Sequence, residues 1–165
     1  MARHTPVRVL VAGPESSGTK LLTQLINEAG GEAIHLSMPY GGGPRPGFVD
    51  WPDLDSAQAD VVVISARDPY ALICSQIENE HVDSEAWSLR RIQEAYRRIF
   101  AWLTVSGLPF FVIPYEALVL QPDAKARFVE LLELNPESVT LNVQDANSKY
   151  YGGTFFRDQR TVDQR

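Results

Sequence analysis

The sequence predicts a three-layer α/β domain, in which a mostly parallel sheet of about four to five strands is flanked by helices. Short apolar runs rich in β-branched residues alternate with segments whose apolar residues recur at helical spacing. A glycine-containing turn joins the first apolar run to the first helical segment. This alternation is typical of parallel strands covered by helices on both faces. The chain has 165 residues, which fits a single domain over residues 1–165.

The first half of the chain contains three expected strands. Residues 7–12 form an apolar run before a glycine, which predicts a buried strand. The first helix follows the glycine turn, and Gly30 and Gly31 are expected to stop it. Residues 32–36 predict a second short strand, and the β-branched residues 60–65 predict the clearest buried strand.

The second half contains three expected helices and one strand. Proline at a first helical position favours a helix over residues 69–79, and an apolar stripe predicts another over 84–105. Residues 110–113 predict a buried strand, and residues 122–134 predict an amphipathic helix. The arginines of the long helix are expected to lie mostly on its solvent face: Arg90, Arg91, Arg97 and Arg98.

Two segments have no periodic pattern. Residues 37–53 are rich in glycine and proline and predict a long surface loop. Phe48 and Trp51 in this loop either cover a ligand or anchor the loop to the core. The tail after Val143 has no assigned element, and its glycine turn at residues 150–153 is a candidate cover for a nucleotide.

Composition narrows the classes of function. The net charge of -6 and pI near 5.0 argue against broad nucleic-acid binding, but they allow one small anionic ligand. The single cysteine, Cys74, excludes an internal disulfide and favours a reducing, cytoplasmic location. We expect no membrane span, because no eighteen-residue apolar run exists, and no signal peptide or metal site.

The segment Gly13–Lys20 (GPESSGTK) lies between a strand and a helix, which is the context of a phosphate-binding loop. Glycines permit the turn, and the helix start presents N–H groups and a positive dipole end to an anion. The alternative is a plain turn whose serines cap the helix. Lys20 stands one residue later than the lysine of nucleotide triphosphatases. The candidate binding residues are Ser16, Ser17, Gly18, Thr19 and Lys20.

A second motif follows the strand at residues 60–65. Arg67 comes at the carboxyl end of that strand, and Ser75 follows eight residues later inside the next helix. Both positions are on the side of an open α/β sheet where ligands bind. The alternative is an Arg67 paired with Asp68 or Glu78, and a Ser75 that only fills a helix position.

Together these motifs resemble the PAPS-dependent sulfotransferase family, which has the P-loop fold. Ser17-Gly18-Thr19 matches the family's Ser-Gly-Thr loop, and Arg67 and Ser75 match a later Arg…Ser segment with the right spacing. Residues 114–134, which begin Pro-Tyr-Glu-Ala-Leu, are similar to a third family segment. The three ordered segments cover residues 7–134.

The resemblance implies 3′-phosphoadenosine 5′-phosphosulfate (PAPS) as co-substrate. The loop would hold its 5′-phosphosulfate, and Arg67 and Ser75 would hold its 3′-phosphate. Many family members have a cation where this chain has Ser16, and Lys20 is the candidate replacement. The family's bases are His or Glu, so the candidate bases are His35, Glu15, Asp50 and His81.

The acceptor is expected to be a small molecule or a carbohydrate with a hydroxyl or amine; a lipid or peptide hydroxyl also remains open. Two other functions stay open at this point. A small-molecule or nucleoside kinase would use ATP and Mg²⁺, but it normally has Lys directly after the second glycine. A non-catalytic nucleotide-binding protein would keep the fold and turn nothing over.

Overall fold

The computed structural model describes residues 6–38, 54 and 58–151. Four strands lie in one sheet in the order β2-β1-β3-β4, and every neighbouring pair is parallel. The strands are β1 (Arg8–Pro14), β2 (Glu32–Met38), β3 (Val61–Ala66) and β4 (Phe110–Pro114). The predicted α/β class with a parallel sheet is confirmed.

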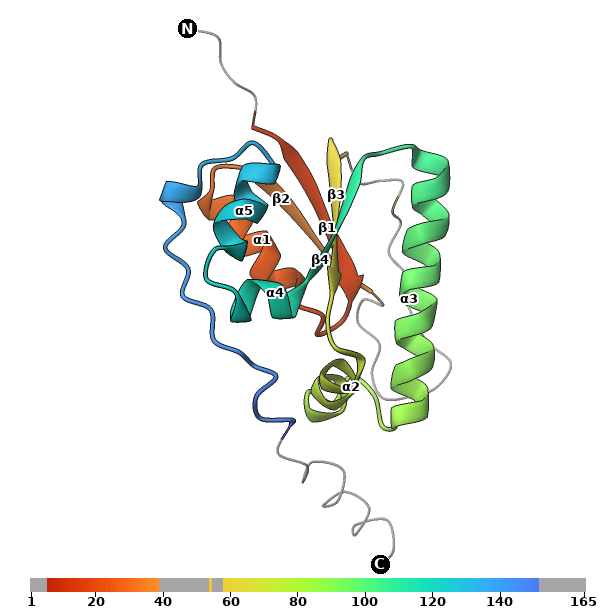
Figure 1. Cartoon of the computed structure of the whole chain (residues 1–165). Coiled ribbons are helices and arrows are strands. Elements are labelled where there is room, and N and C mark those ends of the chain that lie inside the picture. The colour runs from red at the N-terminus through yellow and green to blue at the C-terminus, as the bar shows by residue number, and fades with distance from the viewer. Residues whose placement is uncertain (1–5, 39–53, 55–57, 152–165) are drawn as a thin grey trace, which may run out of the picture.

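Five α-helices connect and cover these strands within the described residues (Figure 1). They are α1 (Thr19–Glu28), α2 (Pro69–Glu78), α3 (Glu85–Ser106), α4 (Tyr115–Leu120) and α5 (Ala124–Leu131). A 3-10 turn follows at Pro136–Ser138. Among these residues, no helix is both long and apolar enough to cross a membrane.

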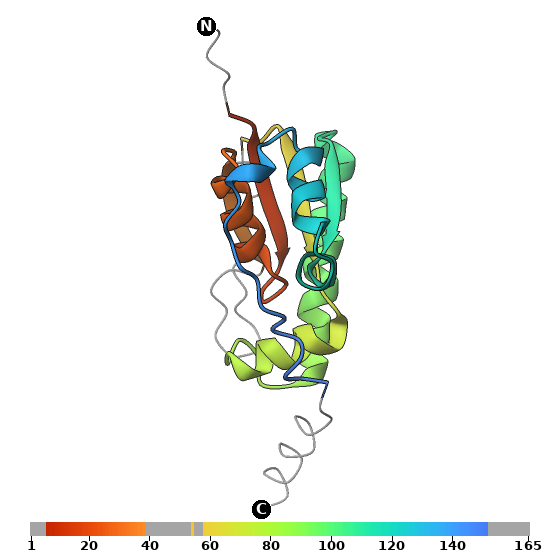
Figure 2. The same ribbon diagram turned by 60° about the vertical axis from the view of Figure 1, so that its left-hand side comes forward.

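The central strands β1 and β3 are buried on both faces, because helices cover each side of the sheet (Figures 1 and 2). Alternate side chains along a strand point to opposite faces. One set packs against α1, α4 and α5: Val9, Val11, Val61 and Val63. The other set packs against α3: Leu10, Ala12, Val62 and Ile64. The result is the predicted three-layer arrangement.

Helix ends follow local sequence signals. The Asp68 carboxylate accepts a hydrogen bond from the Ala71 amide at the start of α2, and the Ser84 hydroxyl caps α3 in the same way. Gly107 ends α3 with a φ of 67°, in the left-handed region that glycine tolerates best. The predicted bounds of these two helices are therefore nearly correct.

Residues 115–134 differ from the prediction. The sequence predicts one helix over 122–134, whereas the chain forms α4 directly after β4 and then the shorter α5. The extended backbone of Gln121 (φ -108°, ψ 117°) separates the two helices. Glu133 has a φ of 58°, and the Leu134 amide bonds the Val129 carbonyl, so α5 ends earlier than its apolar pattern indicates.

The expected loop over residues 37–53 begins later than predicted, because Ser37 and Met38 extend β2. The rest of that loop, with Phe48, Asp50 and Trp51, lies outside the described residues. The same holds for Gly152 and Gly153 of the expected glycine turn.

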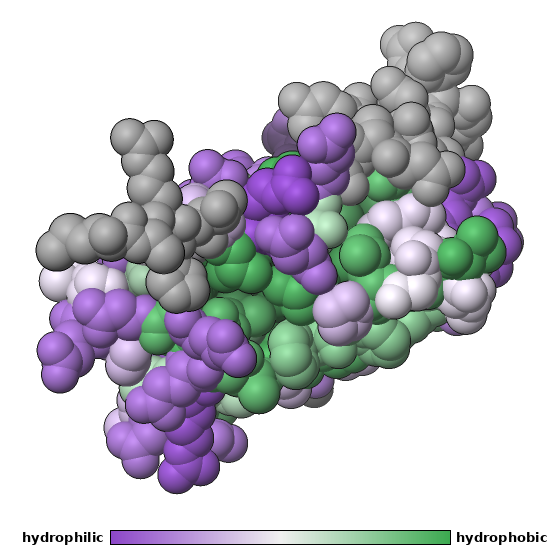
Figure 3. Space-filling view, turned by 90° about the horizontal axis from the view of Figure 1, so that it is seen from above, coloured by the Kyte–Doolittle hydropathy of each residue, from purple (hydrophilic) through white to green (hydrophobic). Residues whose placement is uncertain are grey.

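The amino-terminal edge of the sheet is apolar. A hollow of about 490 Å³ lies there, between the starts of β3 and β4 and the end of α5. Figure 3 looks onto this edge and shows apolar side chains gathered across it between polar flanks. The lining includes Val7, Val61, Phe111, Leu131 and Leu132. Such a surface is poorly suited to an anion, so the motif-bearing carboxyl edge is the candidate site.

Candidate anion-binding site

The carboxyl ends of β1 and β3 bring the two sequence motifs to one edge of the sheet. β1 leads into the loop, and β3 leads to Arg67. After β1 the chain crosses through α1 to β2, whereas after β3 it crosses to β4 on the other side. Open α/β sheets bind ligands where neighbouring crossovers leave in opposite directions.

The loop between β1 and α1 is tight, and two of its residues have left-handed backbone. Ser16 has a φ of 67° and Gly18 has a φ of 102°. Gly18 is the N-cap of α1, and no side chain caps the helix. The alternative interpretation, in which the loop serines cap α1, is therefore wrong. The first N–H groups of the helix keep no side-chain partner within the described part of the chain.

Ser17 is fully buried in this loop. Its carbonyl accepts a hydrogen bond from the Ser65 hydroxyl at 2.6 Å. Its own Oγ has no hydrogen-bond partner among the described residues. A Cβ at Gly13 would lie 2.5 Å from this Oγ, so glycine is required there to leave room for it. A buried hydroxyl without a partner costs about 1–3 kcal/mol, which a suitable ligand oxygen would offset.

Gly18 is constrained by its neighbour as well as by its backbone. A Cβ at this position would lie 2.8 Å from Cδ2 of the Tyr115 ring. The Tyr115 hydroxyl donates to the Gln144 carbonyl and accepts from the Ala146 amide, so the ring cannot move freely. Glycine is thus needed at Gly18 for two independent reasons.

Replacing Gly18 with alanine is expected to destabilise the fold by about 2–4 kcal/mol, from left-handed backbone plus overpacking. Gly30→Ala is the matched control, because Gly30 has a φ of 92° but no atom near a new Cβ. The control should lose only about 1–2 kcal/mol, the backbone cost alone. Urea unfolding measures both values, and equal losses would show that the Tyr115 contact is unimportant.

Arg67 joins the second motif to the loop. Its Nη1 donates to the Ser16 carbonyl at 2.7 Å, and its Nε donates to the Asn147 carboxamide oxygen at 2.7 Å. The guanidinium lies over the Tyr115 ring, 4.9 Å from its centroid. Its buried Nη2 has no partner among the described residues. Arg67 forms no hydrogen bond with Asp68 or Glu78 among the described residues, but its charge is close enough to Glu78 to help lower the pKa of that carboxyl.

A relay of side chains holds Arg67 in place. The Glu116 carboxylate accepts from the Asn147 amide at 2.6 Å and from the Asp68 backbone amide at 2.9 Å. Asn147 is 1% exposed and lies in the tail for which the sequence predicts no element. Tyr115 and Glu116 belong to the third family-like segment, which was the available signal for them. Nothing local in the sequence indicated Asn147.

Ser75 lies on α2, eight residues after Arg67, and is buried. Its hydroxyl accepts from the Asn79 amide at 3.3 Å and also interacts with the Tyr150 hydroxyl. Tyr150 is 1% exposed, and Arg67 lies 5.9 Å from its ring centroid. Arg67 and Ser75 are therefore connected through Tyr150, a residue whose role the sequence left open.

Glu15 has a structural role that its sequence position does not reveal. Its carboxylate accepts from the Arg91 guanidinium at 2.9 Å, so it faces α3. Burial raises the pKa of the Glu15 carboxyl, against the opposing effects of His81 and Arg91. The Gln76 side chain donates to the Glu15 carbonyl and accepts from the Ser88 hydroxyl. These contacts tie the loop to α2 and α3.

Arg91 corrects the expected solvent face of the long helix. Its side chain is 2% exposed, and it also donates to the His81 carbonyl at 2.6 Å. The sequence predicts that Arg91 is exposed like its neighbours. A helical pattern shows which residues share a face, but it does not show that the carboxylate of Glu15 pairs with Arg91 there. Arg97 and Arg98 do lie outside, where both bond the Glu94 carboxylate.

His35 lies beside the start of α1, although it is in the middle of β2 and not at the end of the strand as the sequence predicts. Its Nε2 is 2.9 Å from the Thr19 hydroxyl and 3.1 Å from the Ser37 hydroxyl. Burial and then the positive charge of Lys20 lower the pKa of the imidazole from its ordinary value. His35 is therefore neutral near pH 7 and able to accept a proton.

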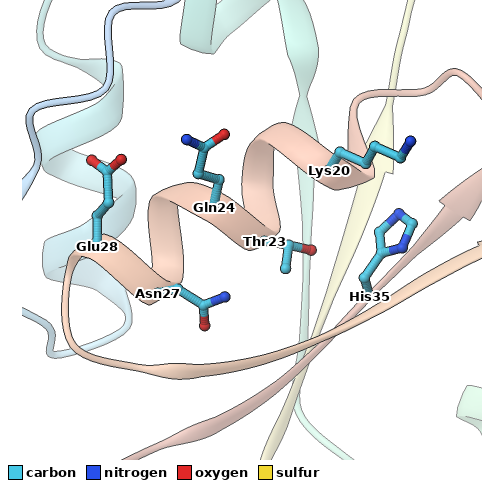
Figure 4. Close-up of a pocket in the computed structure, with 6 residues that line it drawn as sticks. All are labelled: Lys20, Thr23, Gln24, Asn27, Glu28 and His35. Atoms are coloured by element: carbon cyan, nitrogen blue, oxygen red, sulfur yellow. The ribbon is translucent and has the colours of Figure 1, made fainter.

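Lys20 and His35 lie at the same end of an open groove of about 580 Å³ between α1 and β2, which is lined by residues with polar side chains (Figure 4). Thr23, Gln24 and Asn27 continue the groove along α1 toward Glu28. The groove contains a cation, an imidazole and amide groups next to the loop. Lys20 is exposed there.

The imidazole of His35 is expected to titrate with a midpoint below 6.5 in a proton NMR pH series. Lys20→Gln should raise this midpoint, because it removes a positive charge that disfavours the imidazolium. Lys125→Gln, a lysine on α5 that donates to the Leu141 carbonyl, is the control and should leave it unchanged. A His35 midpoint at or above 6.5 would contradict this geometry.

Comparison with known proteins gives no relative: no family model, curated protein or solved structure matches the chain. The function must therefore be inferred from the residues of the candidate site. Within the described residues, no group of three or more His, Cys, Asp or Glu side chains is arranged to hold a metal ion. What the site offers is hydrogen-bond donors, two cations and one neutral imidazole.

Proposed function

We propose that the protein binds PAPS at the carboxyl edge of its sheet and transfers the sulfuryl group to an acceptor hydroxyl or amine. The observation that carries the proposal is the contact between Arg67 and the Ser16 carbonyl at 2.7 Å. Two motifs more than fifty residues apart in sequence form one structure there. Both also contain a buried donor without a partner among the described residues, Ser17 Oγ and Arg67 Nη2.

The donor set fits a ligand with two anionic ends. The loop would bind one end through the N–H groups at the start of α1 and the Ser17 hydroxyl, with the helix dipole favouring the negative charge. Arg67 and Ser75 would bind the other end, with the charge-assisted hydrogen bonds that a phosphate accepts. Glu15 is not part of this set, because Arg91 holds its carboxylate.

His35 is the proposed proton acceptor. In the transfer, the bond between sulfur and the 5′-phosphate oxygen of PAPS would break and 3′,5′-adenosine bisphosphate would leave. The acceptor oxygen or nitrogen would lose its proton as its new bond to sulfur forms. The Nε2 atom of neutral His35 contacts the hydroxyls of Thr19, the first residue of α1, and Ser37. An acceptor hydroxyl or amine that donated to Nε2 in place of one of these hydroxyls would therefore lie next to the loop. Lys20 at the same end of the groove would stabilise negative charge on the transferred group.

The groove between α1 and β2 is the proposed acceptor entrance. Gln24 and Asn27 present amide groups along it, and the described part of its wall contains no Phe, Tyr or Trp. Hydrogen-bonding side chains of this kind suit a polar acceptor, such as a carbohydrate or another small molecule with several hydroxyls.

The runner-up function is a kinase. Its Mg²⁺ would need a carboxylate beside the phosphates. Two acids that flank the motifs are committed, since Glu15 pairs with Arg91 and Asp68 caps α2. The Thr19 hydroxyl, which follows the second glycine, bonds His35 and Ser37. Because these side chains already have partners, they favour a site that binds an anion through hydrogen-bond donors of the protein over one that uses Mg²⁺.

A turnover experiment tests the proposal. The protein is incubated with PAPS, EDTA and a panel of sugars and alcohols, and release of 3′,5′-adenosine bisphosphate is followed. Release that depends on an acceptor and survives EDTA is the expected result. Transfer only from ATP with Mg²⁺ would replace the proposal with the kinase. Binding without turnover of either donor would leave a nucleotide-binding module.

A further inference from the structure

The end of the proposed site that contains Arg67 and Ser75 also contains a carboxylate of the protein, that of Glu78. Glu78, in the last turn of α2, accepts hydrogen bonds from the Tyr150 hydroxyl at 2.6 Å and from the Lys149 ammonium group. Lys149 also lies 4.9 Å from the centroid of the Tyr150 ring. A carboxylate on one helix thus fastens the segment that contains Lys149 and Tyr150.

This carboxylate belongs to the same cluster as Arg67 and Ser75. The Tyr150 hydroxyl that it accepts from also interacts with Ser75, and the Tyr150 ring lies near the Arg67 guanidinium. The hydrogen bonds from Lys149 and Tyr150, together with the charges of Lys149 and Arg67, lower the pKa of the Glu78 carboxyl. Glu78 is therefore ionised at neutral pH beside donors that also suit a phosphate.

We propose that Glu78 is a built-in competitor of the ligand: its carboxylate occupies the donors of Lys149 and Tyr150 and repels the phosphate group that comes to Arg67 and Ser75. This inference rests on the proposed function, because it assigns a phosphate to that end of the site. Binding requires Glu78 to release Lys149 and Tyr150. The contact is autoinhibitory and weakens the ligand-free site's affinity for anions.

Glu78 is half-exposed, with a side-chain relative exposure of 40%, so solvent screens its charge. Two unit charges a few ångströms apart interact by only about 1 kcal/mol in water. Removing the repulsion of one carboxylate from a phosphate group should therefore tighten binding about fivefold to tenfold. If Glu78 only held Lys149 and Tyr150 in place, its loss would not tighten ligand binding, because both residues would become looser.

Glu78→Gln tests the inference, because glutamine keeps an oxygen for Tyr150 and Lys149 but removes the charge. Glu80→Gln is the matched control: it removes the same charge from an exposed acid two residues away. Both variants and the parent are titrated by calorimetry with 3′,5′-adenosine bisphosphate and, separately, with inorganic phosphate. Thermal unfolding without ligand verifies that each variant is folded.

The expected result is bisphosphate binding about fivefold to tenfold tighter in Glu78→Gln than in the parent, with Glu80→Gln within about twofold of the parent. Unchanged or weaker binding in Glu78→Gln, while the parent binds, overturns the inference and leaves the proposed function standing. A gain for inorganic phosphate with no bisphosphate binding supports Glu78 as competitor and rejects the PAPS site. No binding of either anion by any variant rejects both.

Discussion

Glu15→Ala is expected to lower the free energy of unfolding by about 3–5 kcal/mol, because it leaves the Arg91 charge buried without a carboxylate. Arg91 is 3% exposed, and its Nε already lacks a partner among the described residues. Burial lowers the pKa of the Arg91 guanidinium, while Glu15 opposes that effect. Urea denaturation at neutral pH measures the loss.

Glu94→Ala is the control for this prediction. Glu94 also pairs with arginines, Arg97 and Arg98, and these hydrogen bonds lower the pKa of its carboxyl to about 2. That network is exposed, so its loss should cost less than about 1 kcal/mol. Comparable losses in the two variants would mean that the Glu15–Arg91 pair is not a buried anchor.

A double variant separates the stabilising role of Glu15 from ligand binding. Replacing Glu15 and Arg91 together by leucine removes both charges, and stability should recover most of what Glu15→Ala loses. Because we place Glu15 outside the anion site, the double variant should still bind 3′,5′-adenosine bisphosphate. Loss of that binding in a stable double variant would return Glu15 to the site.

Arg67→Ala is expected to weaken binding of 3′,5′-adenosine bisphosphate by about 100-fold or more, since it deletes a desolvated charged donor. The same change leaves the Ser16 carbonyl and the Asn147 carboxamide without their donor, so the loop also loses an anchor. Calorimetric titration measures the affinity, and the melting temperature of the free protein reports the structural part.

Arg98→Ala controls for the loss of an arginine, because Arg98 lies on the exposed side of α3. Its affinity for the bisphosphate should remain within about twofold of the parent. Arg67→Lys keeps a cation but cannot bond Ser16 and Asn147 together, and it should fall between the two. Parent-like binding by a folded Arg67→Ala would exclude Arg67 from the site.

The two central strands were predictable because they are nearly continuous apolar runs. Residues 61–65 are buried on both faces, and the turn after residues 7–12 contains Gly18, whose left-handed backbone favours glycine. Chain order and the handedness of crossovers then place the loop and Arg67 at one edge.

The prediction of a buried strand at residues 110–113 was wrong on burial, because β4 is the last strand of the described sheet and Phe110 and Val112 are exposed. Pro122 signals the break between α4 and α5, because the residue before a proline is pushed out of helical conformation, as Gln121 is. The missed element is the short helix α4 before this break, where the sequence predicts no helix.

The site was predictable only where a motif is contiguous. The loop and the Arg67–Ser75 spacing are local patterns, whereas Asn147 and Tyr150 reach Arg67 from about eighty residues away. Their roles depend on where the tail packs, which local sequence does not determine. The same is true of Arg91, whose burial depends on its contact with Glu15.

The most direct test is a calorimetric titration of the unmodified protein with 3′,5′-adenosine bisphosphate, with ATP and Mg²⁺ titrated in parallel. The proposed site predicts one bound bisphosphate per chain without any metal, and weak binding of ATP. Binding of ATP with Mg²⁺ and none of the bisphosphate would contradict the proposal and favour the kinase.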